Sequence, residues 1–242
     1  MPVRPNARLR YTTAPPPPEA GPRARTYRQL IDAGMRLVQQ RGLVTVAEVA
    51  AAAEVSRATA YRYFPTHGML ITALVEESLG PVRRFESVEQ DGHARLTDLF
   101  VQTFPRFKEF EAQLRAALQL SLEHWALAQA GALKEEQFRR GHRSYILDRA
   151  AAPLRKTLGA AAYGRLMRAL SVIYGIEPYV VLKDVWNSSD REIESVSHWI
   201  LDALIDAALR EANTPSPAPA RVRARARPTQ RPAPRTRPVR RA

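Results

Sequence analysis

The 242-residue sequence contains no cysteine. This absence excludes a disulfide framework and every metal or redox site that depends on cysteine. The chain also lacks an apolar run approaching the roughly 18 residues that a membrane helix needs, and its N-terminus lacks the apolar core of a signal peptide. We therefore expect a cytoplasmic protein with no membrane partner.

The common motifs of enzyme active sites are absent as well. The sequence holds no P-loop, no glycine pattern of a dinucleotide site, no G-x-S-x-G and no H-E-x-x-H. Its five histidines are scattered without the spacing of metal ligands: His67, His93, His124, His142 and His198. We expect no enzymatic activity, no metal and no cofactor.

Positive charge is abundant, but it is confined to the two ends of the chain. The net charge is +13, of which residues 1–25 carry +4 and residues 213–242 carry +9, while residues 26–212 hold 23 basic and 23 acidic residues. Each end also contains seven prolines. Segments of this composition cannot bury enough apolar surface to offset the entropy of ordering them, so we predict two disordered tails.

The tails allow two interpretations. Their arginines can add electrostatic affinity for DNA phosphates, and Arg23 and Arg25 lie near enough to the first predicted helix to reach a minor groove. Alternatively, they reflect an arginine-biased composition, since the chain has 33 arginines and four lysines.

Residues 45–70 carry the most specific local pattern. Gly42 is suited to ending a preceding helix, and Thr45 with Glu48 forms a T-x-x-E capping box at the start of a short amphipathic helix. Ser56 is a good N-cap for a second short helix, on which Ala60 and Phe64 face inward. The pattern predicts two short helices joined by a tight turn.

The outward face of the second helix combines arginine, small and aromatic side chains. Arginine pairs with guanine in the major groove, and alanine or the threonine methyl contacts a thymine methyl. Tyrosine hydroxyls and His67 suit phosphate oxygens. The alternative is an ordinary solvated helix, but the coincidence of caps, turn and basic-aromatic cluster favours DNA binding.

These residues resemble the DNA-binding domain of the TetR (tetracycline-repressor) family of bacterial transcription regulators. The resemblance covers residues 26–75 and rests on the first helix, on Gly42, and on the runs from Thr45 to Ala50 and from Val55 to Pro65. It implies an all-α homodimer in which a helix-turn-helix domain over 26–79 precedes a ligand-binding and dimerisation domain over 80–212.

The resemblance also implies a repressor that a small-molecule effector, as yet unknown, releases from double-stranded DNA. Its DNA-contacting positions fall on Thr45, Arg57, Ala58, Thr59, Tyr61, Arg62, Tyr63 and His67. His67 and Ala47 replace residues that are usually basic in the family, which suggests a weaker intrinsic affinity. The competing hypothesis is a nonspecific architectural protein that coats nucleic acid through its arginine-rich tails.

The remainder of the chain predicts helices throughout. The expected segments, bounded by a break at Leu79-Gly80-Pro81, are 93–104, 105–130, 135–151, 153–158, 160–185 and 190–212. Two apolar stripes could form a four-helix dimer interface or fill the core of one chain: Leu166, Leu170, Ile173 and Tyr174, and Ile193, Val196, Ile200, Leu204 and Ala207/Ala208.

Aromatic residues on these helices are candidates for an effector pocket, although aromatics at helical spacing are more often core residues. The candidates are Phe100, Phe104, Phe107, Trp125, Tyr145 and Tyr174, with Glu123, His124 and Glu177 as possible polar anchors.

Overall fold

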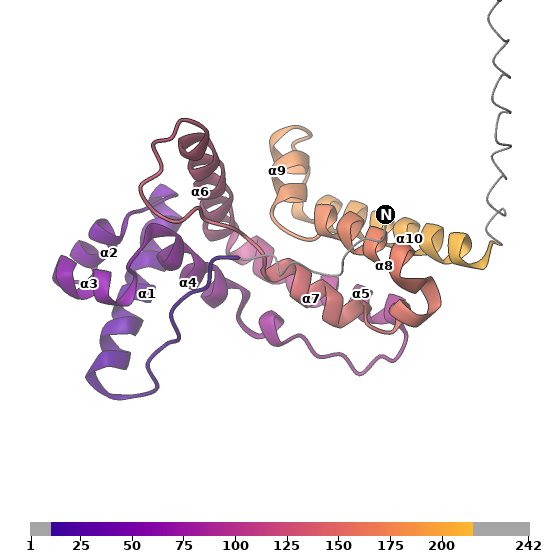
Figure 1. Ribbon diagram of the computed structural model, residues 1–242, viewed down its shortest axis with the longest axis horizontal. Coiled ribbons are helices and arrows are strands. Elements are labelled where there is room, and N and C mark those ends of the chain that lie inside the picture. Colours follow the sequence, from indigo (N-terminus) through magenta and orange to yellow (C-terminus); the bar gives the residue numbers. More distant parts are fainter. Residues whose placement is uncertain (1–10, 215–242) are drawn as a thin grey trace, which may run out of the picture.

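The computed structural model describes residues 11–214, and these form an all-α protein, as predicted (Figure 1). The chain begins with four helices followed by a short 3-10 turn: α1 (Gly21–Arg41), α2 (Val46–Ala52), α3 (Arg57–Tyr63), α4 (His67–Leu79) and η1 (Gly80–Arg84). Six further helices complete the fold: α5 (Gly92–Glu109), α6 (Glu111–Gln129), α7 (His142–Ala151), α8 (Leu154–Ile173), α9 (Glu177–Asp184) and α10 (Asp190–Asn213). Helices α1 to α3 lie at one end of an elongated molecule, and α8 and α10 lie at the other.

The local signals around α2 and α3 act as the sequence predicts. Both halves of the capping box between Thr45 and Glu48 form, and the Ser56 hydroxyl accepts the backbone N–H of Thr59 at the start of α3. Gly42 ends α1 with φ of 80°, in the left-handed region that favours glycine. These contacts are short-range, which is why composition and spacing alone were sufficient to predict them.

The helix boundaries beyond residue 80 differ from the prediction in three places. Helix α5 continues through Pro105 and ends before Phe110, whereas we expected a new helix to begin at that proline. Residues 135–141 precede α7 and are not helical. The predicted helix over 160–185 is divided at Gly175, so that α8 and α9 are separate elements.

The prediction of a disordered arm over residues 1–25 is wrong for residues 21–25, whereas residues 11–20 have no regular secondary structure. Helix α1 begins at Gly21, so Arg23 and Arg25 are helical residues on its first turns. Residues 11–20, called the strap below, run along the molecule toward the segment before α7. The Thr12 backbone N–H donates to the Arg139 carbonyl at 2.9 Å, and the Arg139 N–H donates to the Thr12 hydroxyl at 3.0 Å. Residues 1–10 and 215–242, which hold most of the predicted tails, lie outside the described residues.

The apolar core has two parts, and the first crosses the predicted domain boundary. The N-terminal core contains residues of α1 to α4 together with Ala117, Leu120 and Phe138 from α6 and the loop after it. The Gln113 side chain also donates to the Met35 carbonyl at 3.0 Å. Helix α6 is therefore packed into the N-terminal domain, although it lies more than thirty residues beyond the end of α4.

The second core part joins α5, α7, α8, α9 and α10. Leu166, Leu170, Ile173 and Tyr174 are all buried within it. This apolar stripe of α8 therefore fills the core of one chain, which is the second of the two alternatives that the sequence left open. Within residues 11–214, no helix has both the length and the apolar stretch that crossing a bilayer requires.

Candidate DNA-binding surface and effector cavity

Helix α3 is anchored to α1 through aromatic packing. Ala60 and Phe64 are fully buried, as their inward spacing predicts. The Tyr27 ring on α1 lies 5.5 Å from the Phe64 ring and 6.2 Å from the Tyr63 ring, measured between centroids. Burial is the main reason that the pKa of Tyr27 is raised. The inner face of α3 is thus held rigidly, and its outer face is left to solvent.

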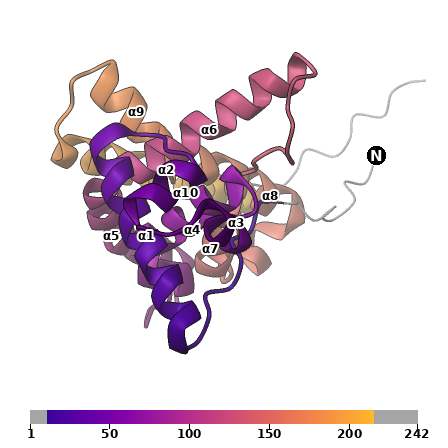
Figure 2. The same cartoon turned by 90° about the vertical axis from the view of Figure 1, so that its left-hand side faces the viewer.

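The outer face carries four of the predicted DNA-contacting residues in exposed positions: Arg57, Ala58, Tyr61 and Arg62. Tyr61 is 46% exposed. Figure 2 shows α2 and α3 on the end of the molecule that faces the viewer, with no other helix in front of α3. The guanidiniums of Arg57 and Arg62 and the phenol of Tyr61 are therefore accessible to a macromolecular partner.

Three other predicted contacts already have partners within the protein. The Thr45 hydroxyl donates to the Glu48 carboxylate at 2.7 Å, and the Thr59 hydroxyl accepts from Ser56 at 2.9 Å. The Tyr63 hydroxyl donates to the Arg23 carbonyl at 3.1 Å. Since a phosphate oxygen can only accept, Thr45 and Tyr63 must give up these bonds before either could donate to DNA.

His67 does not fit the predicted phosphate contact. Its ring is partly buried at the start of α4, and its Nε2 has no hydrogen-bond partner among the described residues. Burial lowers the pKa of His67 below its usual value, so the ring is neutral at pH 7. The Glu135 carboxylate accepts the backbone N–H of His67 at 3.1 Å, and it lies 3.3 Å from His124. A carboxylate from the loop after α6 thus occupies the start of α4.

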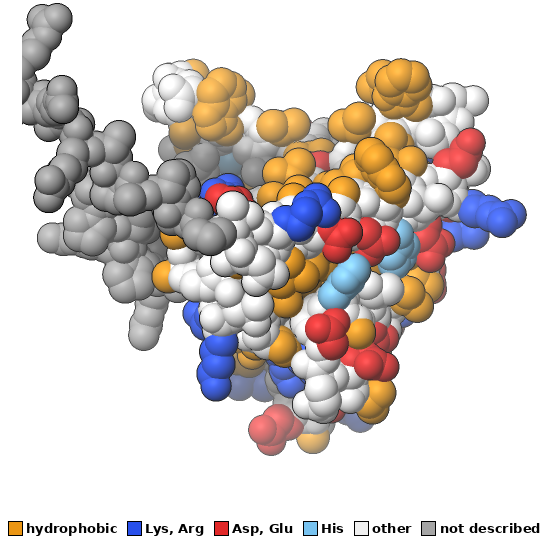
Figure 3. Space-filling view, turned by 90° about the vertical axis from the view of Figure 1, so that its right-hand side faces the viewer, with side chains coloured by type: hydrophobic (Ala, Val, Ile, Leu, Met, Phe, Trp, Pro, Cys, Tyr) orange, Lys and Arg blue, Asp and Glu red, His pale blue; other side chains and the backbone are white. Residues whose placement is uncertain are grey.

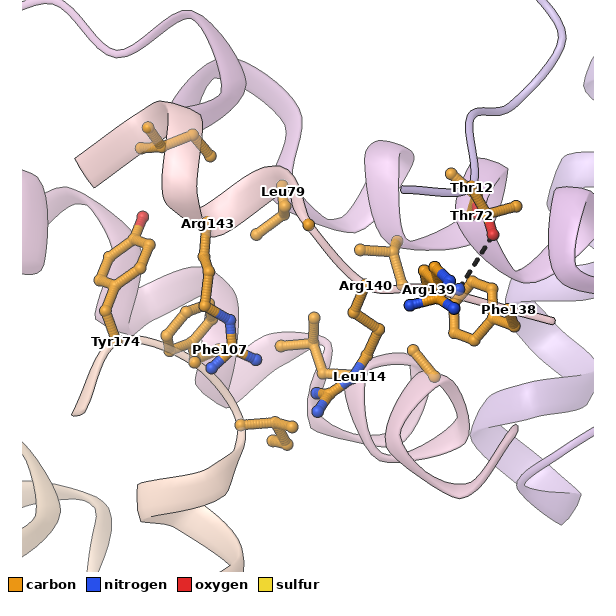
Figure 4. Close-up of a pocket in the computed structure, with 16 residues that line it drawn as sticks. Thr12, Thr72, Leu79, Phe107, Leu114, Phe138, Arg139, Arg140, Arg143 and Tyr174 are labelled. Atoms are coloured by element: carbon orange, nitrogen blue, oxygen red, sulfur yellow. Dashed lines mark hydrogen bonds between the residues drawn. The ribbon is translucent and has the colours of Figure 1, made fainter. Parts of the chain in front are cut away.

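A cavity of about 80 Å³ lies between the strap, α4, α5, α6 and the segment that begins α7 (Figure 4). Of the six aromatic candidates, only Phe107 and Tyr174 line it. Phe100 and Phe104 are buried core residues that stack near His198. Trp125 and Tyr145 are 58% and 59% exposed, so their assignment to this pocket is wrong.

Among the polar candidates, His124 is buried at the Glu135 contact, and exposed Glu123 accepts a hydrogen bond from Gln119.

Three arginines that the sequence reading missed line the cavity: Arg139, Arg140 and Arg143. They come from the segment that was expected to be helical, and sequence spacing gave no sign that they converge. Glu177, at the start of α9, is the acidic partner of Arg140 and Arg143. Its carboxylate accepts from Arg140 at 2.7 Å and from Arg143 at 2.8 Å through each oxygen.

Comparison with protein families supports the identity of the first four helices. The family model described as "Bacterial regulatory proteins, tetR family" matches residues 30–74, which run from within α1 to within α4 and include the whole helix pair. The N-terminal domain belongs to the TetR family. The TetR-family domain is thus the DNA-binding unit of a transcriptional regulator, in agreement with the exposed face of α3.

A solved structure extends the likeness to most of the fold. A TetR transcriptional regulator from Rhodococcus sp. RHA1 superimposes with a TM-score of 0.52 at 18% identity, over 74% of this chain and 97% of that chain. At this identity the likeness concerns the fold, and it includes helices beyond the TetR-family domain. A comparison with curated protein sequences finds no match. Within the described residues, no group of three or more His, Asp or Glu side chains is placed to hold a metal ion.

Proposed function

We propose that this protein is a dimeric, ligand-responsive repressor that binds a palindromic DNA operator through α3. The observation that carries the proposal is the exposed row of Arg57, Ala58, Tyr61 and Arg62 on a helix whose other face is locked against α1. Arginine can read guanine in the major groove, and the alanine methyl can contact thymine. The effector is proposed to enter the 80 Å³ cavity, which α4 of the TetR-family domain helps to line.

A dimer is part of the proposal because two recognition helices must fit successive major grooves, roughly 34 Å apart. The far end of the molecule offers a surface for it, since Val172 on α8 is 68% exposed and Trp199 on α10 is 72% exposed. Of the predicted α10 stripe, Ile193 and Ala208 are buried, whereas Val196 and Ala207 are exposed. Figure 3 shows hydrophobic side chains gathered on this end. The proposed interface therefore uses the outward side of α10.

The effector would act by favouring one relation between the TetR-family domain and the rest of the chain. The cavity touches α4 through Thr72, Val75 and Leu79, and α4 is packed against α1 and α6. A ligand that changes the packing of α4 would therefore shift the TetR-family domain. Coupling of this kind is typically about 1–3 kcal/mol, or roughly 5- to 150-fold in affinity for DNA.

The decisive experiment is selection of bound sequences from random duplex DNA at moderate salt. We expect the intact protein to select a palindromic motif, and Arg57→Ala to weaken binding to it by roughly 10-fold or more, since a bidentate arginine–guanine contact discriminates by about 1–3 kcal/mol. Arg191→Ala is the matched control because Arg191 is an exposed arginine on α10, outside the TetR-family domain. Binding without any motif, unaffected by Arg57→Ala, would instead favour a nonspecific architectural protein that acts through its arginine-rich tails.

A further inference from the structure

The cavity beside α4 has apolar walls and a strongly basic edge. Its apolar side chains come from four different helices and the loops between them: Leu79, Phe107, Leu114, Phe138, Ile146 and Ile176. Its basic edge is the segment just before and within the first turn of α7. Figure 4 shows the side chains of Arg140 and Arg143 extending from this segment toward Leu114 and Phe107. Such a combination suits a ligand with an apolar body and one polar end.

The charges at the basic edge do not balance. Arg140 and Arg143 share the single carboxylate of Glu177. Both terminal nitrogens of Arg143 are engaged, because it also donates to the Ser171 carbonyl at 2.8 Å. Both guanidiniums remain protonated at any physiological pH, so Arg140 and Arg143 together carry one positive charge more than Glu177 neutralises.

Arg140 has a hydrogen-bond donor that is not used within the described residues. One of its terminal nitrogens donates to Glu177, but its buried Nε has no hydrogen-bond partner among the described residues. A buried donor without an acceptor costs free energy, and the cost is larger for a charged group. The guanidinium is carried on a stem of flexible methylenes, so a modest shift turns this edge of it toward the cavity.

We propose that the effector of this cavity is a small carboxylic acid, whose carboxylate pairs with Arg140 and whose apolar body lies against Phe107 and Leu114. The inference rests on the proposed function, because it names the class of effector. An acid satisfies the buried Nε and neutralises the excess charge, whereas an amine would be repelled and a neutral molecule would leave the charge uncompensated. Arginine favours carboxylates through paired N–H donors.

The size of the cavity limits the acid and gives the strap a role. At about 80 Å³ the space admits only a short-chain acid, and it is well below the roughly 300–1,000 Å³ of pockets that hold drug-sized ligands. Thr12 of the strap forms one wall, held by its two hydrogen bonds to Arg139. Gly141 has no side chain where Tyr11 passes, and a Cβ there would lie 2.4 Å from that of Tyr11. A longer acid must displace the strap.

The test uses propionate and butyrate as probes, with propionamide and butyramide as neutral molecules of matched shape. Isothermal titration calorimetry of the full-length protein should show saturable binding of at least one acid with a Kd below about 1 mM and at least about tenfold weaker binding of its amide. Equal binding of acid and amide, or no binding of either acid, would overturn the proposal.

Three variants locate the contact. Arg140→Met should weaken acid binding by about tenfold or more, while Arg149→Met, which removes an arginine on α7 outside the cavity, should leave it unchanged. Glu177→Gln removes the competing carboxylate and should tighten acid binding. This opposite sign keeps the test valid if Arg140→Met folds poorly, because weaker acid binding by Glu177→Gln would contradict the charge argument. DNA selection without acid tests the regulator separately, so either result can fail alone.

Discussion

At the scale of single residues, His67 shows how a family position can keep its place in the sequence and lose its usual role. The pattern placed a phosphate-contacting side chain at the start of α4. In the structure the ring turns inward, and the Glu135 carboxylate takes the backbone N–H that a DNA phosphate could have used. The sequence could not reveal this, because residue 135 lies in a loop after α6 and is brought to α4 only by folding.

The buried His67 ring leads to a prediction about pH. Burial is the largest cause of its lowered pKa, and the ring is neutral in the folded protein at pH 7. Its folded-state pKa lies below the unfolded value of about 6.5, so the unfolded chain binds the proton more tightly. The contribution of the neutral His67 ring to the free energy of unfolding is therefore fully present above about pH 6.5. It is lost as the pH falls below that value, at no more than about 1.4 kcal/mol per pH unit.

Urea unfolding between pH 7 and 5 measures this effect. We expect His67→Gln to flatten the pH dependence of the free energy of unfolding in that range. His93→Gln, on the more exposed face of α5 beside Asp202, provides the control. A slope that survives His67→Gln and disappears in His93→Gln would show that a different histidine is responsible.

At the scale of secondary-structure elements, the turn between α2 and α3 contains an uncommon backbone conformation. Glu54 has φ of 54°, in the left-handed region that glycine adopts without strain. The turn is closed by the Val55 N–H, which donates to the Ala50 carbonyl at 2.9 Å. Capping signals predicted where the two helices begin, but they did not indicate the strained backbone of Glu54 in the turn that joins them.

Glu54→Gly should relieve this strain. A left-handed conformation costs an ordinary residue roughly 1–2 kcal/mol, and the extra flexibility of glycine in the unfolded chain cancels about 0.5–1 kcal/mol of the gain. We therefore expect Glu54→Gly to raise the free energy of unfolding by up to about 1.5 kcal/mol, measured by chemical denaturation. Ala51→Gly, in the last turn of α2, is the control and should lower the stability by about 1 kcal/mol. A loss of stability in both variants would contradict the argument.

At the scale of the whole molecule, the surfaces proposed for DNA and for the dimer lie at opposite ends. The helices between them form two apolar cores, with α6 packed into the first and α8 and α10 into the second. The effector cavity lies between these cores and is lined by residues of both. This placement gives a ligand contact with α4 and with the segments that support α8 and α9.

The dimer proposal predicts a change of mass. Trp199 projects from α10 beside exposed Val196, and an aromatic side chain in such a patch is a common centre of an interface. We expect Trp199→Glu to convert a dimer into a monomer in sedimentation velocity and to weaken operator binding, because one recognition helix then acts alone. Trp125→Glu on α6 is a matched control, with 58% of the tryptophan exposed. If the dimer persists in Trp199→Glu and dissociates in Trp125→Glu, the interface lies on α6 and not on α10.

The sequence by itself determined the helix-turn-helix, the outward face of α3 and the all-α class, because caps, turns and helical periodicity depend on residues within a few positions of one another. Only the tertiary structure decided which residues surround the cavity, since Thr12, Leu114 and Arg140 come from three separate segments. It also decided that the apolar stripe of α8 is core and that Phe138 completes the N-terminal domain. An apolar stripe indicates that one face of a helix is buried. Which element packs against that face is determined by contacts between distant parts of the chain.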